Sequence, residues 1–537
     1  MKCITIKEFK KSYKHSSDGV YLYGASVTGR GILQLLEKVS IKVEAFIDKD
    51  SDKRRKLFCG YNVILPQDVA KNASVIITTS SGAAGSVDSM LRKEYGIEKV
   101  YYFELESIIV KHLFYIRGYD ADKIDEYEDT YQRLVQKYNA IVMYPMWADR
   151  VGEFVCRYMI MQQDLKDEIN NRYRVVLPYV RPENNLPYAN TRMMEMISRQ
   201  CPIVFKGNEE FWAYVVTEHI TEIELYNTYI HTLGAYAEMA KLPWEKTMRY
   251  TENTPPVLNF SRQEEEEAYR KAEKLGIKEP FVCIFARDSS YLMQRKGNWS
   301  YHDYRDSDIN NFRLMAEYLK ERGIQVVRVG TVSKGRLFGE NVIDITNDNY
   351  DELLDLYVNA KCICWIGAVS GAEFLSGMFR RRKISINAML VDSYDITPYF
   401  MGQSYYIPKL YFSVKENRYL SLKEMLVLDL SGEPPHLYKE KFQVDIIQNT
   451  AEDILELYLE CEQKESGTWE YTEGEKSLQE KYQMVLRDIR KKYPNGWVDY
   501  AGSPIENHLP VIPIGSSFLK KYQSFLLQEY KNGDGSK

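Results

Sequence analysis

The sequence predicts an α/β protein with three Rossmann-like domains in succession and a helical C-terminal tail. Short apolar runs, typical of buried strands, alternate with amphipathic helical stretches in three series. Such alternation indicates parallel sheets covered by helices. The chain has 537 residues, and a domain takes about 100–200 residues, so the length suits three or four domains.

The first series predicts a domain over residues 1–112. An apolar strand at 20–26 runs into a glycine turn, and the helix after it, at 28–39, carries Ile32, Leu35, Leu36 and Val39 at helical spacing. Further buried strands are expected at 43–48, 73–81 and 99–103.

The glycine turn of this domain is a candidate nucleotide site. Gly24, Ser26 and Gly29 follow a G-x-S-x-x-G spacing between strand and helix, where free amide groups suit a phosphate. Asp48 ends the next strand, where an acidic residue can bind a ribose hydroxyl. Ser26 replaces the middle glycine and limits close approach to a pyrophosphate. The turn therefore equally suits a domain that keeps it only for folding.

The second series predicts a domain over residues 113–265, opened by a charged, Tyr-rich helix at 113–135. Asp149 and Glu153 flank Gly152 after the first strand, and Gly152 would let another backbone or a sugar come close. Either carboxylate could face an interdomain cleft there and take a proton from a hydroxyl. The alternative is that both acids only complement the dipole of a helix N-terminus. The expected strands are 139–146, 173–180 and 202–207, and the expected helices are 151–163, 191–200 and several between 209 and 245.

The third series predicts a domain over residues 266–430, and the charged residues 431–537 predict a helical extension. A boundary is expected at 251–267, which has a Pro pair before an acidic helix start. The expected strands are 281–287, 324–330, 361–367 and 383–388, and the expected helices are 308–323, 349–360 and 370–379.

The polar loop after the strand at 281–287 is the most informative stretch. Arg287 and Arg305 bracket this loop and could hold a diphosphate through forked, charged hydrogen bonds. Asp308 or Ser307 could instead cap the following helix, which would leave the two arginines unexplained. The other candidate ligand-binding residues of this stretch are Asp288, Ser289, Tyr291, Asp308 and Asn310.

Two further strand ends supply candidates. Arg328 and Gly330 end the next strand, although a solvent-facing arginine and a turn glycine would explain them as well. Ser370, Gly371 and Glu373 begin a helix after a buried strand, so backbone amides there could meet a phosphate. A close-packed turn is the alternative for this segment.

The composition of the chain argues against several classes of protein. The net charge of −5 argues against a general nucleic-acid binder. The eight cysteines form no repeated CxxC pairs and the seven histidines no paired spacing, so buried free thiols in a reducing compartment are expected and a structural zinc site is not. Neither a signal peptide nor a run of about 18 apolar residues is visible. We expect a cytoplasmic protein.

Residues 280–390 resemble a family of bacterial glycosyltransferases for surface polysaccharides. The resemblance lies in the order of ARDSSY, HDYRDSDINNF, VVRVG and WIGAVSGAEF, and it extends weakly to DRVGEF upstream and IPIGSSFLKKY downstream. The family resembles GT-B enzymes, which pair two Rossmann-like domains. It implies that 266–430 binds a nucleotide-sugar donor, with Arg287, Arg305, Ser370, Gly371 and Glu373 around it. It also implies that 113–265 binds the acceptor and supplies a base near Asp149 and Glu153.

The implied activity is sugar transfer from a nucleotide-activated donor to a glycan or lipid-linked glycan, with peripheral contact to a membrane or to biosynthetic partners. No metal and no other cofactor is expected if arginines supply the positive charge. Two alternatives stay open. The first is an NAD(P)-dependent nucleotide-sugar oxidoreductase or epimerase using residues 18–105. The second is a non-catalytic nucleotide-sugar-binding protein.

Overall fold

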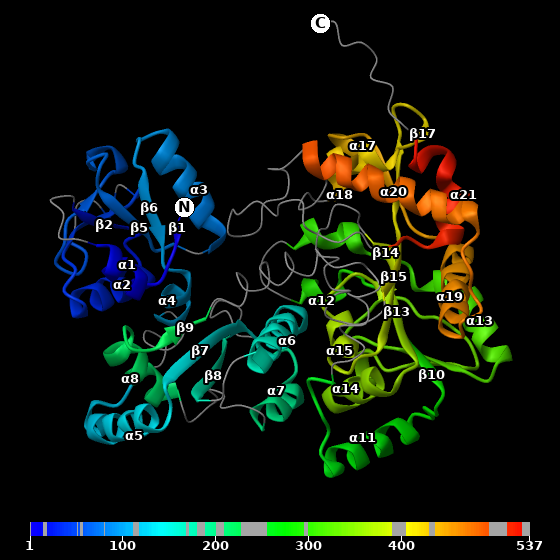
Figure 1. Ribbon diagram of the computed structural model, residues 1–537, viewed down its shortest axis with the longest axis horizontal. Coiled ribbons are helices and arrows are strands. Elements are labelled where there is room, and N and C mark those ends of the chain that lie inside the picture. The colour runs from blue at the N-terminus through cyan, green and yellow to red at the C-terminus, as the bar shows by residue number, and fades with distance from the viewer. Residues whose placement is uncertain are drawn as a thin grey trace, which may run out of the picture.

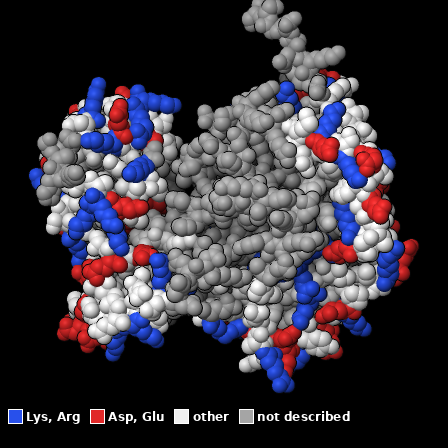
Figure 2. All heavy atoms as spheres, in the orientation of Figure 1, with Lys and Arg blue, Asp and Glu red and all other residues white. Residues whose placement is uncertain are grey.

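The computed structural model describes most of the chain, and its coloured ribbon in Figure 1 shows an α/β protein with parallel sheets. The described residues are 2–13, 19–50, 52–53, 57–79, 81–110, 118–167, 171–179, 188–199, 209–226, 255–294, 299–388, 404–428, 435–492 and 513–528. On the described parts of the face seen in Figure 2, charged side chains of both signs are interspersed.

The first sheet has six strands in the order β1-β6-β5-β2-β3-β4, and every pair is parallel. The sequence predicted β2, β3, β5 and β6 but not the two-residue strands β1 and β4. The strands are β1 Lys2–Cys3, β2 Val20–Tyr23, β3 Val43–Ile47, β4 Val63–Ile64, β5 Ser74–Ile77 and β6 Lys99–Tyr102. The helices are α1 Ile6–Ser12, α2 Val27–Lys38, α3 Ser81–Lys93 and α4 Glu104–Ile109.

The second sheet has the order β8-β7-β9 and is also parallel. The strand expected at 202–207 lies outside the described residues, and so does the segment 227–250. The helix expected at 113–135 is described from residue 124. The elements are α5 Ile124–Lys137, β7 Ala140–Trp147, α6 Val151–Asp167, β8 Arg172–Tyr179, α7 Thr191–Ser198, α8 Glu209–His219 and β9 Glu224–Leu225.

The third sheet has six parallel strands in the order β12-β11-β10-β13-β14-β15. Its central strands consist of buried apolar residues, as strands covered on both faces require. The strands are β10 Phe281–Phe285, β11 Gln325–Arg328, β12 Val342–Asp344, β13 Cys364–Ala368, β14 Arg382–Ala388 and β15 Ser404–Pro408. The helices are α11 Arg262–Lys274, α12 Ser290–Met293, α13 Arg313–Glu321, α14 Glu352–Lys361 and α15 Glu373–Met378.

Several short 3₁₀ turns lie between the helices and strands. The helix expected at 308–323 begins as the turn η6, because Asp308 caps that turn and α13 starts only at Arg313. Another turn, η5, carries several polar residues of the loop after β10. The turns are η1 Pro66–Asp68, η3 Ala121–Lys123, η5 Ser300–Arg305, η6 Ile309–Phe312 and η7 Asn347–Asn349.

The C-terminal part shares its core with the third sheet, because one hydrophobic cluster contains residues of both, such as Phe312 and Phe518. Besides the expected helices it contains β18, which pairs antiparallel with β16 in a small sheet ordered β17-β16-β18. The elements are β16 Leu410–Ser413, β17 Arg418–Tyr419, α17 Leu422–Leu428, α18 Pro435–Glu440, β18 Val444–Ile447, α19 Ala451–Glu465, α20 Glu473–Lys492 and α21 Ser516–Leu526.

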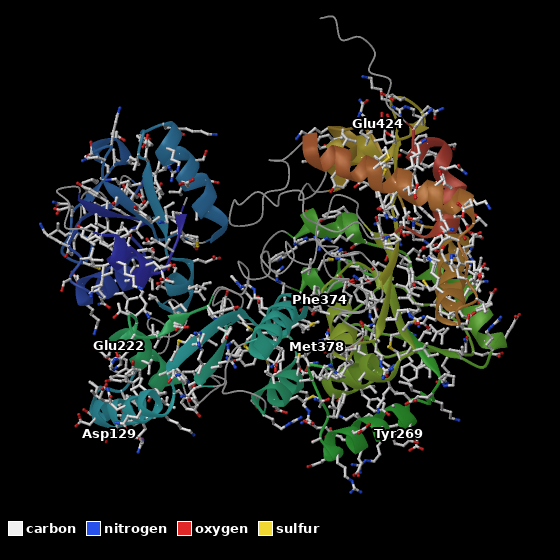
Figure 3. All side chains as sticks on the ribbon, viewed as in Figure 1. Asp129, Glu222, Tyr269, Phe374, Met378 and Glu424 are labelled. Carbon is white, nitrogen blue, oxygen red and sulfur yellow. The ribbon has the colours of Figure 1, made fainter. Side chains whose placement is uncertain are left out.

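Two further hydrophobic clusters join the sheets. One cluster contains residues of the first and second sheets, including Val43 and Met143. We call the parts of the chain that contain the first, second and third sheets the first, second and third units. Another cluster connects α6 and α7 of the second unit with α14 and α15 of the third unit. Figure 3 shows Met378 and Phe374 of α15 at this boundary. The second unit therefore packs against the third through helices that follow strand ends.

Candidate functional site

Arg287 lies at the carboxyl end of β10, the edge where open α/β sheets bind ligands. Its side chain is buried, with 8% of the residue exposed. Nη1 forms an ion pair with Asp306, and the backbone carbonyl accepts from Ser307 N at 2.9 Å. Nη2 is buried and has no hydrogen-bond partner among the described residues. Because a buried, unpaired guanidinium nitrogen is costly, this atom marks a place where an acceptor group can bind.

Two serine hydroxyls near Arg287 share this property. Ser290 Oγ and Ser307 Oγ are buried and have no hydrogen-bond partner within the described part of the chain. Ser290 begins α12 and donates its backbone N–H to Asp288 Oδ1 at 2.8 Å, and Ser307 is bonded to the backbone of Arg287. Three polar groups at one strand end are therefore available to a ligand.

Arg305 adds a second guanidinium to this region. Its Nε and Nη2 donate to Tyr304 Oη at 3.0 and 2.9 Å, which orients the group along the end of η5. Burial and the nearby charge of Arg305 lower the pKa of Arg287 to about 10. Both effects disfavour the charged form of Arg287, and a bound anion would relieve them.

His302 shows that a third arginine acts on the same region. Burial, together with the charges of Arg305, Arg287 and Arg150, lowers the pKa of its imidazole to about 3. His302 is therefore neutral at neutral pH. We call Arg150, Arg287 and Arg305, whose charges all act on His302, the cationic cluster.

Arg150 comes from the second unit, between β7 and α6. Its Cζ lies 5.8 Å from the ring centroid of Trp299, and Trp299 stacks on His302 with the centroids 6.1 Å apart. A Cβ placed on Gly152 would overlap Gly371 Cα, so the two units approach to backbone contact beside the cluster. The sequence predicted that Gly152 permits a close approach, and the structure shows that the partner is the turn after β13.

The predicted base residues lie at this same junction. Asp149 is buried and immediately precedes Arg150. Glu153 lies in the first turn of α6, and its side chain is outside the described part of the structure. Their catalytic role stays a prediction.

Asp288 and Ser289 are bound to the loop that follows β11. Asp288 Oδ2 accepts a hydrogen bond from Lys334 N at 2.7 Å, and Oδ1 accepts one from Ser290 N. Both carboxylate oxygens therefore have partners within the protein. Lys334 Nζ lies 3.5 Å from Ser289 Oγ. Tyr291 is half-buried in α12. Asp288 thus connects two loops at the sheet edge, and its predicted contact with a ligand stays untested.

Arg328 is buried rather than solvent-facing, and the structure gives it internal partners. Nη1 donates to Gly335 O at 2.6 Å and Nη2 to Lys334 O at 3.0 Å, with Asp344 3.3 Å from Nη1. Gly330 has φ +127°, and a Cβ there would lie 3.2 Å from the ring of Phe285. Arg328 therefore holds the loop after β11 in place instead of pointing at the cluster.

The three donor-binding residues predicted in the turn between β13 and α15 have different surroundings in the structure. Gly371 touches the second unit, and Ser370 Oγ accepts from Ala372 N at 3.2 Å. Glu373 and Lys383 are 1% and 0% exposed and form an ion pair with a distance of 2.6 Å. The carboxylate of Glu373 is thus bound to Lys383 inside the third unit, whereas the sequence suggested a donor contact.

Asp308 and Asn310 lie away from the buried part of the loop. Asp308 Oδ1 accepts from Asn310 N at 2.9 Å and caps η6, which is the alternative that the sequence left open. Both residues are exposed. The arrangement gives Asp308 a local structural role.

The glycine turn of the first unit is closed by its own side chains. Gly24 has φ +115°, and a Cβ on Gly29 would overlap Gly24 O. Asp48 Oδ2 accepts from Ala25 N at 3.1 Å and from Lys53 Nζ at 2.8 Å, and Ser26 Oγ accepts from Gly29 N at 3.3 Å. Burial raises the pKa of Asp48, but these bonds outweigh it and the pKa lies below its ordinary value. Two amides of the turn are therefore already bonded.

Sequence reasoning missed Trp299, His302, Asp306 and Lys409. Trp299 and His302 stand in the polar loop between Arg287 and Arg305, and Asp306 directly follows Arg305, so the loop itself was the signal. Lys409 follows β15, and nothing in its local sequence indicates a site. Among the described residues there is no group of three or more metal-ligating His, Cys, Asp or Glu side chains. None of the described helices is long and apolar enough to span a membrane.

No protein-family model and no curated protein matches the chain. The ADP-heptose lps heptosyltransferase II of E. coli aligns over 73% of this chain and 90% of its own, with 11% identity and a TM-score of 0.25. A family 9 glycosyl transferase of Veillonella parvula aligns over 74% and 87%, with 9% identity and a TM-score of 0.25. The UDP-GlcNAc 2-epimerase of Methanocaldococcus jannaschii aligns over 73% and 88%, with 10% identity and a TM-score of 0.20. TM-scores this low do not establish a common fold.

Proposed function

We propose that this chain is a glycosyltransferase that moves a sugar from a nucleotide-activated donor to a glycan or lipid-linked glycan in surface-polysaccharide biosynthesis. The observation that supports the proposal is Arg287 Nη2, a buried guanidinium nitrogen without a partner among the described residues. The charges of Arg305 and of Arg150 from the second unit act on His302 together with that of Arg287. A diphosphate fits this demand, because each of its phosphates offers oxygens to forked guanidinium donors.

Departure of a nucleoside diphosphate leaves negative charge that the protein must stabilise. Guanidinium groups that are already desolvated and fixed do so without reorganising, and their effect is larger than in water. In the proposal, Arg287 and Arg305 hold the diphosphate from the third unit, and Arg150 reaches it from the second. In the proposal, the charge of these arginines takes the place of a metal ion. The hydroxyls of Ser290 and Ser307, which have no partner in the described part of the chain, complete the phosphate contacts in the proposal.

The acceptor hydroxyl needs a base when it attacks the sugar. Asp149 is our candidate, because it adjoins Arg150 and lies within a few residues of the contact between Gly152 and Gly371. Glu153 is one helical turn away and is the second candidate. In the proposal, the acceptor therefore enters from the side of the second unit.

A binding screen against nucleotides, nucleotide sugars and NAD(P) tests the proposal. A donor should raise the melting temperature of the wild-type protein, because only the folded state binds it. We expect Arg287→Ala to weaken donor binding at least tenfold and to abolish transfer, and Arg287→Lys to recover binding only in part. Arg262→Ala removes an arginine whose side chain is 93% exposed on α11 and is the matched control.

Normal sugar transfer by Arg287→Ala would contradict the proposed donor site. Stabilisation by NAD(P) alone would favour an oxidoreductase that uses the first unit. Donor binding without transfer in the presence of acceptors would identify a binding protein.

A further inference from the structure

Lys409 is an interior lysine at the junction of β15 and β16. Only 3% of the residue is exposed, and its backbone N–H donates to Ala388 O at 2.8 Å, which fixes the start of the side chain against β14. Its Nζ donates to Tyr304 O at 2.8 Å and to Asp306 O at 2.6 Å. Two neutral carbonyls are thus its hydrogen-bond partners.

These two carbonyls flank Arg305, so the hydrogen bonds from Lys409 fix the backbone of the segment 304–306. The same segment is bound on its other side to Arg287, through the ion pair with Asp306 and the backbone bond from Ser307. Lys409 and Arg287 therefore fix one short segment between them. The guanidinium of Arg305, bonded to Tyr304 Oη, depends on the position of this segment.

Among the described residues, no acidic side chain is paired with Lys409. Burial lowers the pKa of its ammonium to about 7, and the charge of Arg287 acts in the same direction. In the neighbouring loop, the pKa of His302 is about 3, and burial raises the pKa of Asp303 above its ordinary value. Asp306 is paired with Arg287, and Arg305 keeps its charge.

We propose that Lys409 is the positioning residue of the cationic cluster. When an anion binds at the cluster, Lys409 takes up one proton from the solvent. The inference rests on the proposed function only in using the same anion site, because it requires no sugar transfer. Above pH 7 the free protein holds Lys409 largely neutral, and a nearby dianion favours its charged form.

Inorganic sulfate is a suitable probe, because its charge is constant across the relevant pH range. Proton uptake is measured with an indicator in weak buffer at pH 6 and pH 8, against sodium chloride at equal ionic strength. Sulfate binding is followed in parallel by thermal unfolding. For the wild type at pH 8 we expect uptake approaching one proton per chain, and almost none at pH 6, where Lys409 is already charged.

Two variants separate the proposed role from a purely structural one. Lys409→Gln keeps hydrogen-bond donors for the two carbonyls but no charge, so it should take up no proton and bind sulfate weakly at both pH values. Lys409→Arg keeps a permanent charge, so it should bind at pH 8 as well as at pH 6, again without uptake. Cooperative unfolding of each variant confirms that it folds.

The outcomes distinguish the two proposals. Sulfate binding that Arg287→Ala abolishes, without proton uptake in the wild type, would overturn the role of Lys409 and leave the anion site standing. Sulfate binding that Arg287→Ala leaves unchanged would remove the cationic cluster as the anion site, and with it both proposals. Uptake that persists in Lys409→Gln would move the proton to another group and overturn the inference.

Discussion

Glu106 is a buried carboxyl group in α4 that connects two parts of the first unit. Oε1 accepts from Ile6 N at 2.5 Å, whereas Oε2 is buried without a partner among the described residues. Burial raises the pKa of Glu106 to about 7. The folded state therefore holds a proton that the unfolded state releases above about pH 4.5. The stability this group contributes is fully present below that value and is lost as the pH rises through about 7.

Glu106→Gln should remove this pH dependence. Glutamine stays neutral at all pH values, so we expect the variant to be more stable than the wild type at pH 8, by up to about 3 kcal/mol, and similar to it at pH 4.5. Urea unfolding at both pH values measures the difference. Glu98→Gln, an exposed site before β6, is the control and should change stability little. Equal stability of Glu106→Gln and wild type at pH 8 would show that Glu106 is already ionised at no cost.

The pair Glu373–Lys383 allows a second test at the level of single residues. Glu373→Gln removes the negative charge that is paired with the buried ammonium of Lys383, so we expect a loss of about 3–5 kcal/mol in unfolding free energy. The double variant Glu373→Gln/Lys383→Met removes both charges and should recover most of that loss. Chemical denaturation of the single and double variants gives the coupling. A stable Glu373→Gln variant with weakened donor binding would instead support the donor contact that the sequence suggested.

At the scale of elements, two helices meet through a shared cap. The Glu352 carboxylate of α14 accepts from the backbone N–H groups of Thr191 and Arg192 at 2.9 and 3.1 Å. These are among the amides that the first turn of α7 leaves without an intrahelical partner. Asn190 caps the same helix and donates to Glu352 O at 3.1 Å. A helix of the second unit is thus completed by a carboxylate of the third.

The loop after β11 is another case in which an element depends on residues outside it. Arg328 donates hydrogen bonds to two backbone carbonyls of this loop. Asp288, which follows β10, accepts a hydrogen bond from a backbone N–H of the same loop. Asn347 adds bonds to both the N–H and the carbonyl of Ser333, each 3.2 Å long. The loop that borders the cationic cluster is therefore fixed by side chains of three separate segments.

At the scale of the whole molecule, the contact between Gly152 and Gly371 sets how closely the second and third units approach. Gly152→Ala should force them apart, because the added methyl group overlaps the Gly371 backbone, which cannot rotate away. We expect a loss of about 1–3 kcal/mol, as for other overpacked sites, and weaker donor binding because Arg150 moves with α6. Thermal unfolding and donor affinity measure the two effects.

Gly85→Ala is the matched control for this variant. Gly85 lies in α3, and a Cβ there would meet nothing within 4 Å. Alanine favours a helix over glycine by about 1 kcal/mol, so this variant should be as stable as the wild type or more so. If Gly152→Ala behaved in the same way, the contact between the units would not be close in solution.

Local sequence patterns predicted the central elements well, because β10 and β13 are apolar runs whose burial on both faces leaves few other structures open to them. The two-residue strands β1 and β4 were missed, since their pairing depends on neighbours already in place. The strand β18 was missed within a charged stretch that otherwise forms helices. Arg287 was placed at the sheet edge by its position directly after a strand.

The sequence by itself determined three β/α series, the position of Arg287 at a strand end and the close approach at Gly152, because strand periodicity, turn glycines and the polarity of loops are local properties. Only the tertiary structure decided that Glu373 binds Lys383, that Arg328 is internal, and that Lys409 meets a segment 103 residues away in the chain. The physical reason is that burial and charge depend on which distant side chains share a space. That information resides in packing and not in any one stretch of sequence.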